Sequence, residues 1–254
     1  MHPGVGPLVE AEQLYVRQSR LQERLLAAGG AEASLVVFDI GLGAGSNAVA
    51  ARAVSEAAPV GAARLQLISF ERDLGAFELA LGQGAAFGFE GEMAQAARAL
   101  LQSGRHDSAR TSWRLEAGDL RAALARHEAG GARADIVFWD PFSPRANPDL
   151  WTVAAFAAIR RCAGPACTLF TYSASTATRV AMLLAGWAVG VGDGIGSKER
   201  TTAAAVRLED LARPLDRSWL ARLALPDAPL PLDAPVDAAA RVAAAAQFQG
   251  LAPG

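Results

Sequence analysis

The stretch "VVFDIGLGAGSNAVA" at residues 36–50 decides which fold class this chain is expected to adopt. It opens with a β-branched and aromatic run, passes through three glycines and continues into an Ala-rich segment with helical periodicity. Glycines let the chain turn tightly, and they let a ligand approach the backbone without a Cβ in the way. The stretch therefore predicts a strand, a ligand-binding turn and a helix that begins near Ser46.

Strand and helix patterns alternate through most of the chain. We expect strands at 34–40, 64–71, 111–119, 134–140 and 166–172, and helices at 46–58, 74–81, 92–103, 120–128, 150–161 and 174–185. This alternation predicts an α/β fold, with a mostly parallel sheet covered by helices on both faces. The Gly-rich stretch 186–208 predicts a C-terminal hairpin that adds an antiparallel pair at the edge of the sheet.

Three segments are expected along the chain. Residues 1–33 form a helical segment, with one helix around 8–28, and residues 34–208 form the α/β domain. Residues 209–254 carry six of the thirteen prolines and an Ala-rich stretch. We therefore expect them to form a loosely packed tail or short helices.

Composition excludes several classes of protein. With 254 residues, 52% of them hydrophobic, the chain can bury a core without disulfides or metals. Its net charge of −2 predicts no global basic field for nucleic acid. Cys162 and Cys167 lack nearby His or Cys partners, so we expect buried thiols and no zinc site. No leader or apolar run of ~18 residues is visible, so a cytoplasmic protein is expected, without a membrane span.

Asp39 and the glycines distinguish two classes of ligand. Dinucleotide sites prefer G-x-G-x-x-G, with a pyrophosphate at the helix N-terminus. Here Ser46 stands in place of the last glycine, and Asp39 lies two residues before Gly41. A carboxylate beside the loop suits a ligand with an amino group better, which favours S-adenosylmethionine over NAD. The pattern of Asp39, Gly41, Gly43 and Gly45 resembles the first motif of Rossmann-like class I methyltransferases.

Two more acids stand where predicted strands end. Glu71 ends the second strand, where a carboxylate can accept both ribose hydroxyls. Asp119 ends the third and could accept from the adenine amino group, although a helix N-cap is its alternative role. Because ligands bind outside the carboxyl ends of such strands, these acids are expected to line the cofactor site together with Asp39.

Asp140 ends the fourth strand and opens the motif "DPFSP". The motif resembles the Asp/Asn-Pro-Pro-aromatic motif of class I methyltransferases that act on exocyclic amines, with Phe142 in place of the second proline. A carboxylate that accepts the hydrogens of an amine aims its lone pair at the methyl donor and can take its proton. The two prolines of the motif would hold that geometry.

Four segments together resemble the tRNA 5-methylaminomethyl-2-thiouridine methyltransferase family, which includes the methyltransferase domain of MnmC and single-domain forms. They are "GPLVEAEQLYVRQSRLQERL" (6–25), "DIGLGAGSN" (39–47), "DPFSPRANPDLWT" (140–152) and "GSKERTTAA" (196–204). Asn47 stands at the asparagine of the family's glycine loop. The resemblance spans about 6–206, and its most specific part is 140–152.

The resemblance implies methyl transfer from S-adenosylmethionine to the 5-aminomethyl group of a wobble uridine in tRNA. Asp140 would orient or deprotonate the amine beside the cofactor, and Phe142 would pack against the base or the cofactor. The substrate-binding residues that it implies are Tyr15, Arg145, Trp151, Lys198 and Arg200. A separate oxidoreductase is the expected source of the aminomethyl group.

Other interpretations remain open at this point. The Pro-rich loop could simply cap the next helix through Asn147 or Asp149. An aminopropyltransferase related to spermidine synthase would need several acids to hold a polyamine, and Arg145 argues against that. A small-amine methyltransferase fits the same motifs. A catalytically silent binding module would have no need of the four strand-end acids.

Overall fold

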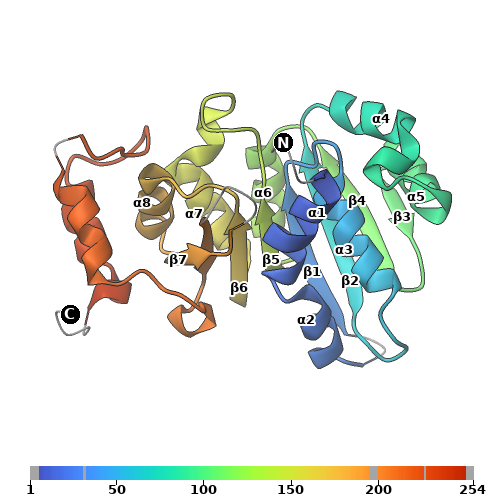
Figure 1. Cartoon of the computed structure of the whole chain (residues 1–254), viewed down its shortest axis with the longest axis horizontal. Helices are drawn as coiled ribbons and strands as arrows, with labels where there is room; N and C mark the ends of the chain where they lie inside the picture. Colours follow the sequence, from blue (N-terminus) through green and yellow to red (C-terminus); the bar gives the residue numbers. More distant parts are fainter. Residues whose placement is uncertain (1–5, 31–32, 195–199, 226, 250–254) are drawn as a thin grey trace.

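The fold is built on one mixed sheet of eight strands, in the order β3-β4-β2-β1-β5-β6-β8-β7. The computed structural model describes residues 6–30, 33–194, 200–225 and 227–249. The strands are β1 (Ser34–Ile40), β2 (Arg64–Glu71), β3 (Arg105–Asp107), β4 (Thr111–Ala117), β5 (Ala134–Trp139), β6 (Ala163–Thr171), β7 (Ala188–Gly192) and β8 (Thr201–Ala205). Figure 1 shows the sheet crossing the molecule from β3 to β7, with the C-terminal segment beyond β7.

The pairing confirms a mostly parallel sheet with an antiparallel C-terminal pair. Strand β1 lies at the centre and pairs in parallel with β2 and β5, which are flanked in parallel by β4 and β6. Strand β8 pairs antiparallel with both β6 and β7, so β7 forms the edge. The three-residue β3, antiparallel to β4, was not predicted because a strand this short shows no periodicity. With β3 the sheet has eight strands, one more than the five strands and the C-terminal pair that we expected.

Helices cover both faces of the sheet. They are α3 (Ser46–Glu56), α4 (Gly75–Gly82), α5 (Gly91–Ser103), α6 (Leu120–Glu128), α7 (Val153–Arg161) and α8 (Thr176–Leu184). The period of two in β1 shows why both faces need covering. Val36, Phe38 and Ile40 join the core beneath α6, α7 and α8, whereas Leu35 and Val37 join the core beneath α3, α4 and α5. No helix within the described ranges is long and apolar enough to cross a membrane.

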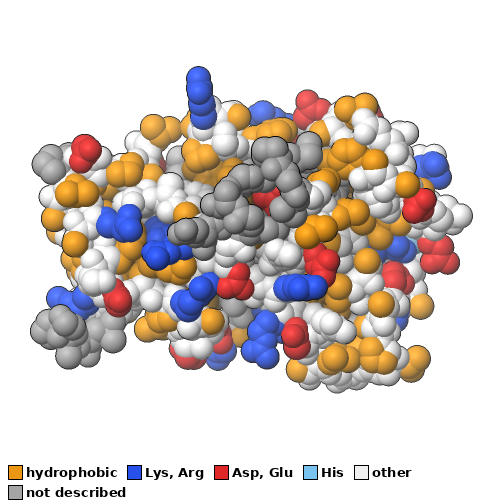
Figure 2. Space-filling model, in the orientation of Figure 1, with side chains coloured by type: hydrophobic (Ala, Val, Ile, Leu, Met, Phe, Trp, Pro, Cys, Tyr) orange, Lys and Arg blue, Asp and Glu red, His pale blue; other side chains and the backbone are white. Residues whose placement is uncertain are grey.

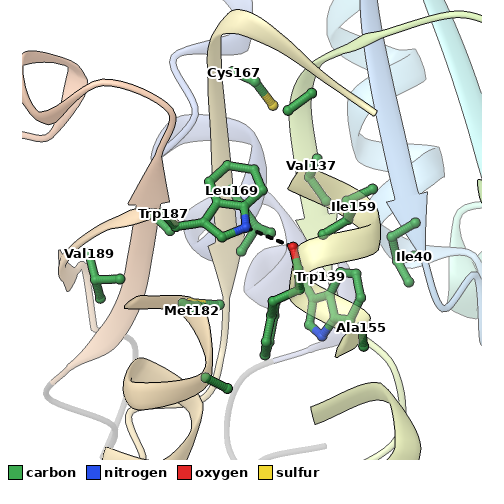
Figure 3. Packing of buried hydrophobic residues seen from close by; sticks show 14 of the residues in the cluster. Ile40, Val137, Trp139, Ala155, Ile159, Cys167, Leu169, Met182, Trp187 and Val189 are labelled. Carbon is green, nitrogen blue, oxygen red and sulfur yellow. Dashed lines mark hydrogen bonds between the residues drawn. The ribbon is translucent and has the colours of Figure 1, made fainter. Parts of the chain in front are cut away.

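The core beneath α7 and α8 is rich in aromatic side chains. Figure 3 shows Trp139, Ile159, Met182 and Trp187 packed together between β5, α7 and α8. The indole Nε1 of Trp187 donates to the carbonyl oxygen of Phe156 at 3.0 Å. A buried indole N–H without a partner would be destabilising, so this bond fixes where α7 meets the residues before β7.

The N-terminal segment is not the single helix expected at 8–28. It consists of α1 (Pro7–Ala11), a π-helix at Glu12–Arg17 and α2 (Leu21–Ala27). The break comes at Arg20, which adopts a left-handed φ of 55°, rare for a residue with a Cβ. Hydrophobic periodicity does not register such a break, because α1, the π-helix and α2 all bury apolar residues against the same face of the sheet.

The C-terminal segment packs against the sheet and is not loose. Arg213 and Leu215 continue the sheet beyond β7, through Val191 N–H to the Arg213 carbonyl at 2.8 Å and Leu215 N–H to the Val189 carbonyl at 2.9 Å. The buried side chain of Gln247 bonds both the N–H and the carbonyl of Val189, each at 2.7 Å. The 3-10 helix Arg217–Ala224 and α9 (Ala238–Ala243) complete the segment. It therefore covers the otherwise exposed edge at β7.

One residue of this segment reaches the start of α7. The carboxylate of Asp233 accepts the backbone N–H of Val153 at 2.8 Å and that of Ala154 at 2.9 Å. Thr152, the N-cap itself, accepts the N–H of Ala155 at 3.2 Å. Three of the four free N–H groups at the helix start are thus satisfied, two of them by a residue 80 positions away.

We expect Asp233→Ala to lower the free energy of unfolding by about 1–2 kcal/mol, because two N–H groups lose a charged acceptor. Asp233→Asn keeps one acceptor oxygen and should lose less. Urea unfolding followed by tryptophan fluorescence measures both. Equal stability of the wild type and Asp233→Ala would show that Asp233 does not cap α7 in solution.

Candidate active site

Two loops meet at the carboxyl edge of the central strands. The N–H of Asp140 donates to the Ile40 carbonyl at 2.9 Å, and the N–H of Gly41 donates to the Phe70 carbonyl at 3.0 Å. Gly41 has a φ of +87°, and a Cβ built on it would lie 2.6 Å from the Asp140 carbonyl oxygen and 2.8 Å from the Cα of Pro141. Only glycine therefore lets the loop after β1 touch the loop after β5.

Two cavities share the residues of this contact. The smaller, of about 140 Å³, lies over the ends of β1, β2 and β4, and the larger, of about 500 Å³, lies between the glycine loop and the N-terminal helices. Both are lined by Gly41, Gly43, Asp140, Pro141 and Phe142. The loop that begins at Asp140 therefore forms part of the wall that the two cavities share.

The smaller cavity holds the two acids that end β2 and follow β4. Glu71 Oε2 accepts the N–H of Gly43 at 3.0 Å, which ties the carboxylate to the glycine loop. Asp119 Oδ1 accepts the N–H of Ala122 at 3.0 Å, so Asp119 is the N-cap of α6. Both acids also line the cavity. The capping role expected as an alternative for Asp119 is therefore present, and it leaves the other oxygen for a ligand.

Asp39 lies beneath the glycine loop and lines neither cavity. Its side chain is completely buried, and Oδ2 accepts from the Ser69 hydroxyl at 2.8 Å. Burial, together with the negative charges of Asp140 and Glu71, raises the pKa of Asp39 to about 7. Its Oδ1 has no hydrogen-bond partner within the described part of the chain. A cationic ligand above the loop would compensate this buried charge, which fits S-adenosylmethionine.

Asp140 is surrounded by polar groups from three other elements. Its Oδ2 accepts from the amide nitrogen of Asn47 at 2.8 Å, and Asn47 lies in the first turn of α3. Tyr15 lies on the buried π-helix, and burial followed by the charge of Asp140 raises its pKa. The same two causes raise the pKa of Tyr172, whose hydroxyl donates to the Pro141 carbonyl at 3.2 Å.

The larger cavity has an acidic and aromatic lining. It contains Glu10, Asp140, Tyr15 and Tyr172, with no Lys, Arg or His among the described residues that line it. Sequence reasoning missed Glu10 and Tyr172. Tyr172 directly follows β6, so the rule that ligands bind at carboxyl strand ends could have found it.

The remaining predicted site residues lie away from the cavity walls or only at their mouth. Phe142 lines both cavities and is 64% exposed. Trp151 lines neither, because its buried indole donates to the Phe142 carbonyl at 3.0 Å and packs against Tyr172. Gly45 is the left-handed N-cap of α3 and also lines neither.

Arg145 and Arg200 are exposed and outside both cavities. Lys198 lies outside the described residues. The structure thus brings the predicted acids and glycines to one edge but does not bring the predicted basic residues to the cavities.

Replacing Gly41 by Ala should destabilise the chain more than the same change at Gly61. Both residues have positive φ, +87° and +94°, so both variants carry backbone strain of roughly 1–3 kcal/mol. Only Gly41 would also clash, since nothing lies within 4 Å of a Cβ at Gly61. Urea unfolding should give a lower free energy of unfolding for Gly41→Ala than for Gly61→Ala. Calorimetry should show loss of S-adenosylmethionine binding in Gly41→Ala alone. Equal effects of both changes would mean that the loops do not touch.

Asp39→Asn should stabilise the ligand-free protein at pH 8. Folding raises the pKa of this carboxyl from 3.8 to about 7, so the folded state holds its proton more tightly than the unfolded state. The free energy of unfolding therefore falls as the pH rises between these values. An amide carries no such penalty, so the gain should grow from pH 5 to pH 8, on the order of 4 kcal/mol at most.

Thermal unfolding at both pH values measures this gain, with Asp237→Asn, an exposed site on the C-terminal segment, as the control. A variant that is no more stable than the wild type at pH 8 would show that burial does not perturb Asp39.

Comparison with known proteins identifies the family. Residues 90–207 match a family model described as S-adenosyl-L-methionine-dependent methyltransferase. Two curated relatives are both named tRNA 5-methylaminomethyl-2-thiouridine biosynthesis bifunctional protein MnmC. The one from Pseudomonas aeruginosa (strain UCBPP-PA14) is 31% identical over 208 residues, which are 78% of this chain and 30% of the relative. The one from Ralstonia nicotianae is 31% identical over 216 residues, 80% of this chain and 31% of the relative.

This chain therefore spans about a third of the length of these relatives. The crystal structure of MNMC2 from Aquifex aeolicus is similar over 92% of this chain and 75% of that chain, with a TM-score of 0.66 and 25% identity. These similarities confirm the expected methyltransferase fold and its cofactor, S-adenosylmethionine. The chain belongs to the S-adenosyl-L-methionine-dependent methyltransferases and, within them, to the family of the MnmC methyltransferases.

Proposed function

We propose that this protein methylates the 5-aminomethyl group of 5-aminomethyl-2-thiouridine at the wobble position of tRNA. The observation that carries the proposal is the position of Asp140, which lines both cavities. A carboxylate in this shared wall would face a methyl donor in the smaller cavity and an amine in the larger one. The names of the MnmC relatives support the tRNA nucleoside as the source of the amine.

The smaller cavity is the proposed cofactor site. S-adenosylmethionine supplies an electrophilic methyl group on a positively charged sulfur. Glu71 would accept the ribose hydroxyls, and the free oxygen of Asp119 would accept from the adenine amino group. Gly41 and Gly43 would let the ligand approach the backbone of the loop. Asp39 would contribute its negative charge from below, without direct contact.

The larger cavity is the proposed nucleoside site. Its two acids, and the absence of basic side chains among the described residues that line it, favour a cationic amine over an anionic group. Tyr15, Tyr172 and Phe142 offer aromatic surface for a planar base. Asp140 would accept the hydrogens of the amine, aim its lone pair and receive its proton, while Asn47 holds the carboxylate in place at 2.8 Å.

The predicted partners follow from this substrate. Exposed Arg145 and Arg200, with Lys198 from the sequence, are candidates for contact with tRNA. A separate oxidoreductase is the source that we propose for the aminomethyl group, and a tRNA substrate places the enzyme in the cytoplasm. We assign methyl transfer to residues 34–208. Within the N-terminal segment 1–33, Glu10 and Tyr15 would form a wall of the nucleoside site, and within the C-terminal segment 209–254, Asp233 supports α7.

The alternatives have less support. An aminopropyltransferase or a small-amine methyltransferase would fit the acidic cavity, but the named relatives favour a tRNA nucleoside. A silent binding module would not explain why Asn47 and two tyrosines surround Asp140. The spermidine-synthase-like reaction is therefore the second candidate, to be tested on the same preparation.

Asp140→Asn should lower kcat for methyl transfer by roughly 10²-fold or more, because an amide cannot take the proton of the amine. The assay follows labelled methyl from S-adenosylmethionine into tRNA bearing 5-aminomethyl-2-thiouridine, and nucleoside mass spectrometry locates the product. The matched control is Asp237→Asn, the same chemical change at an exposed site of the C-terminal segment.

Transfer by the wild type and the control but not by Asp140→Asn would support the substrate and the site together. A wild type that binds S-adenosylmethionine but leaves this tRNA unmethylated would rule out the proposed substrate. Polyamines and decarboxylated S-adenosylmethionine would then be tested next.

A further inference from the structure

Arg179 is a buried cation that has no acidic partner among the residues that the structure describes. It lies in the first turn of α8, and only 6% of the residue is exposed. Its Nε donates to the Thr202 hydroxyl at 3.1 Å and its Nη2 to the Thr201 carbonyl at 3.0 Å. No ion pair to Arg179 is formed within the described part of the chain. Both hydrogen-bond partners are neutral, so no described residue forms an ion pair that compensates the charge of the guanidinium.

Other arginines in similar surroundings have carboxylates. Arg52, with 3% exposure, lies 3.3 Å from the carboxylate of Glu56. Partly buried Arg24 is attracted by the charge of Asp135. Burying a charge is costly unless it is paired, and two neutral acceptors could be served equally well by an uncharged donor. A purely structural clamp therefore does not account for an arginine at position 179.

The neighbours of Arg179 add positive charge. Arg200 directly precedes Thr201, one of the two partners, and its side chain is exposed. Arg222, on the 3-10 helix of the C-terminal segment, is also exposed and forms no ion pair with the described residues. Burial lowers the pKa of Arg179, and the charges of Arg222 and Arg200 lower it further. Figure 2 shows basic side chains gathered on this face between the C-terminal segment and β7.

This cluster lies beside the proposed nucleoside site. Thr202 on β8 is paired with Thr171 on β6, and the next residue, Tyr172, lines the larger cavity. The guanidinium thus stands one strand away from the cavity wall, at the same edge of the sheet. A polynucleotide whose base enters the cavity would bring its backbone near this edge.

We propose that Arg179, Arg200 and Arg222 form a binding site for a backbone phosphate of the RNA substrate. The inference rests on the proposed function and adds the group that holds the nucleic acid. A guanidinium has five N–H donors in a planar fork, and the two bonds to threonines leave donors of Arg179 for phosphate oxygens. The phosphate would supply the negative charge that the buried guanidinium lacks, while the exposed arginines would guide it there.

The test is the salt dependence of binding to unmodified tRNA, measured by fluorescence anisotropy between 50 and 300 mM KCl. Each lost phosphate contact should reduce the slope of log K against log salt by roughly 0.7–0.9, and weaken binding about three- to tenfold near 0.15 M. We expect this for Arg179→Gln and for Arg222→Gln. The control is Arg105→Gln, which removes one exposed positive charge on β3 at the opposite edge of the sheet.

Slopes equal to the control in both variants would overturn the phosphate site, as would a wild type that binds no tRNA. Arg222 is exposed, so its variant tests the site even if Arg179→Gln does not fold. Failure of the proposed function looks different. The slope would still fall in the two variants, but no methyl group would reach tRNA bearing 5-aminomethyl-2-thiouridine.

Discussion

The backbone contact between Gly41 and the Asp140–Pro141 peptide is the constraint on which the site depends. Strands β1 and β5 are neighbours in the sheet, so the loops that follow them leave at the same edge and compete for the same space. A residue with a Cβ at position 41 would push them apart, since the nearest backbone atom would be 2.6 Å away. With glycine the loops touch, and their contact separates one depression of the edge into two cavities that share Asp140.

Negative charge is concentrated around this contact. Asp39 lies below the glycine loop, Glu71 beside it and Asp140 above it, and the first of these is buried deeply enough to hold a proton near neutral pH. Such an arrangement is unfavourable in the empty protein and favourable once a cation is present. A positively charged methyl donor bound here would relieve this electrostatic repulsion, and a product without the sulfonium charge would relieve less of it.

The sequence predicted the strands and helices of the central sheet because they show clear periods, and because β1, β2, β4 and β5 end at or directly before a glycine or an acid. It did not predict the break at Arg20 or strand β3, since neither leaves a periodic signal. The sequence also did not predict the roles of residues whose partners lie far away along the chain. Tyr172, Asp233 and Gln247 each contact segments that are 31 to 80 positions away, and Trp151 turned inward to bond Phe142. Local sequence patterns do not show which distant segments come into contact.

The C-terminal segment has a consequence for how independent the methyltransferase domain is. It supplies the last backbone pairing at the edge of the sheet and the carboxylate that holds the first turn of α7. That turn comes directly after the loop that begins at Asp140. Within this loop, the carbonyl of Phe142 accepts a hydrogen bond from the indole of Trp151. The geometry of the proposed reaction centre therefore depends partly on residues after 208, and the structural unit that supports it extends beyond the sequence motifs.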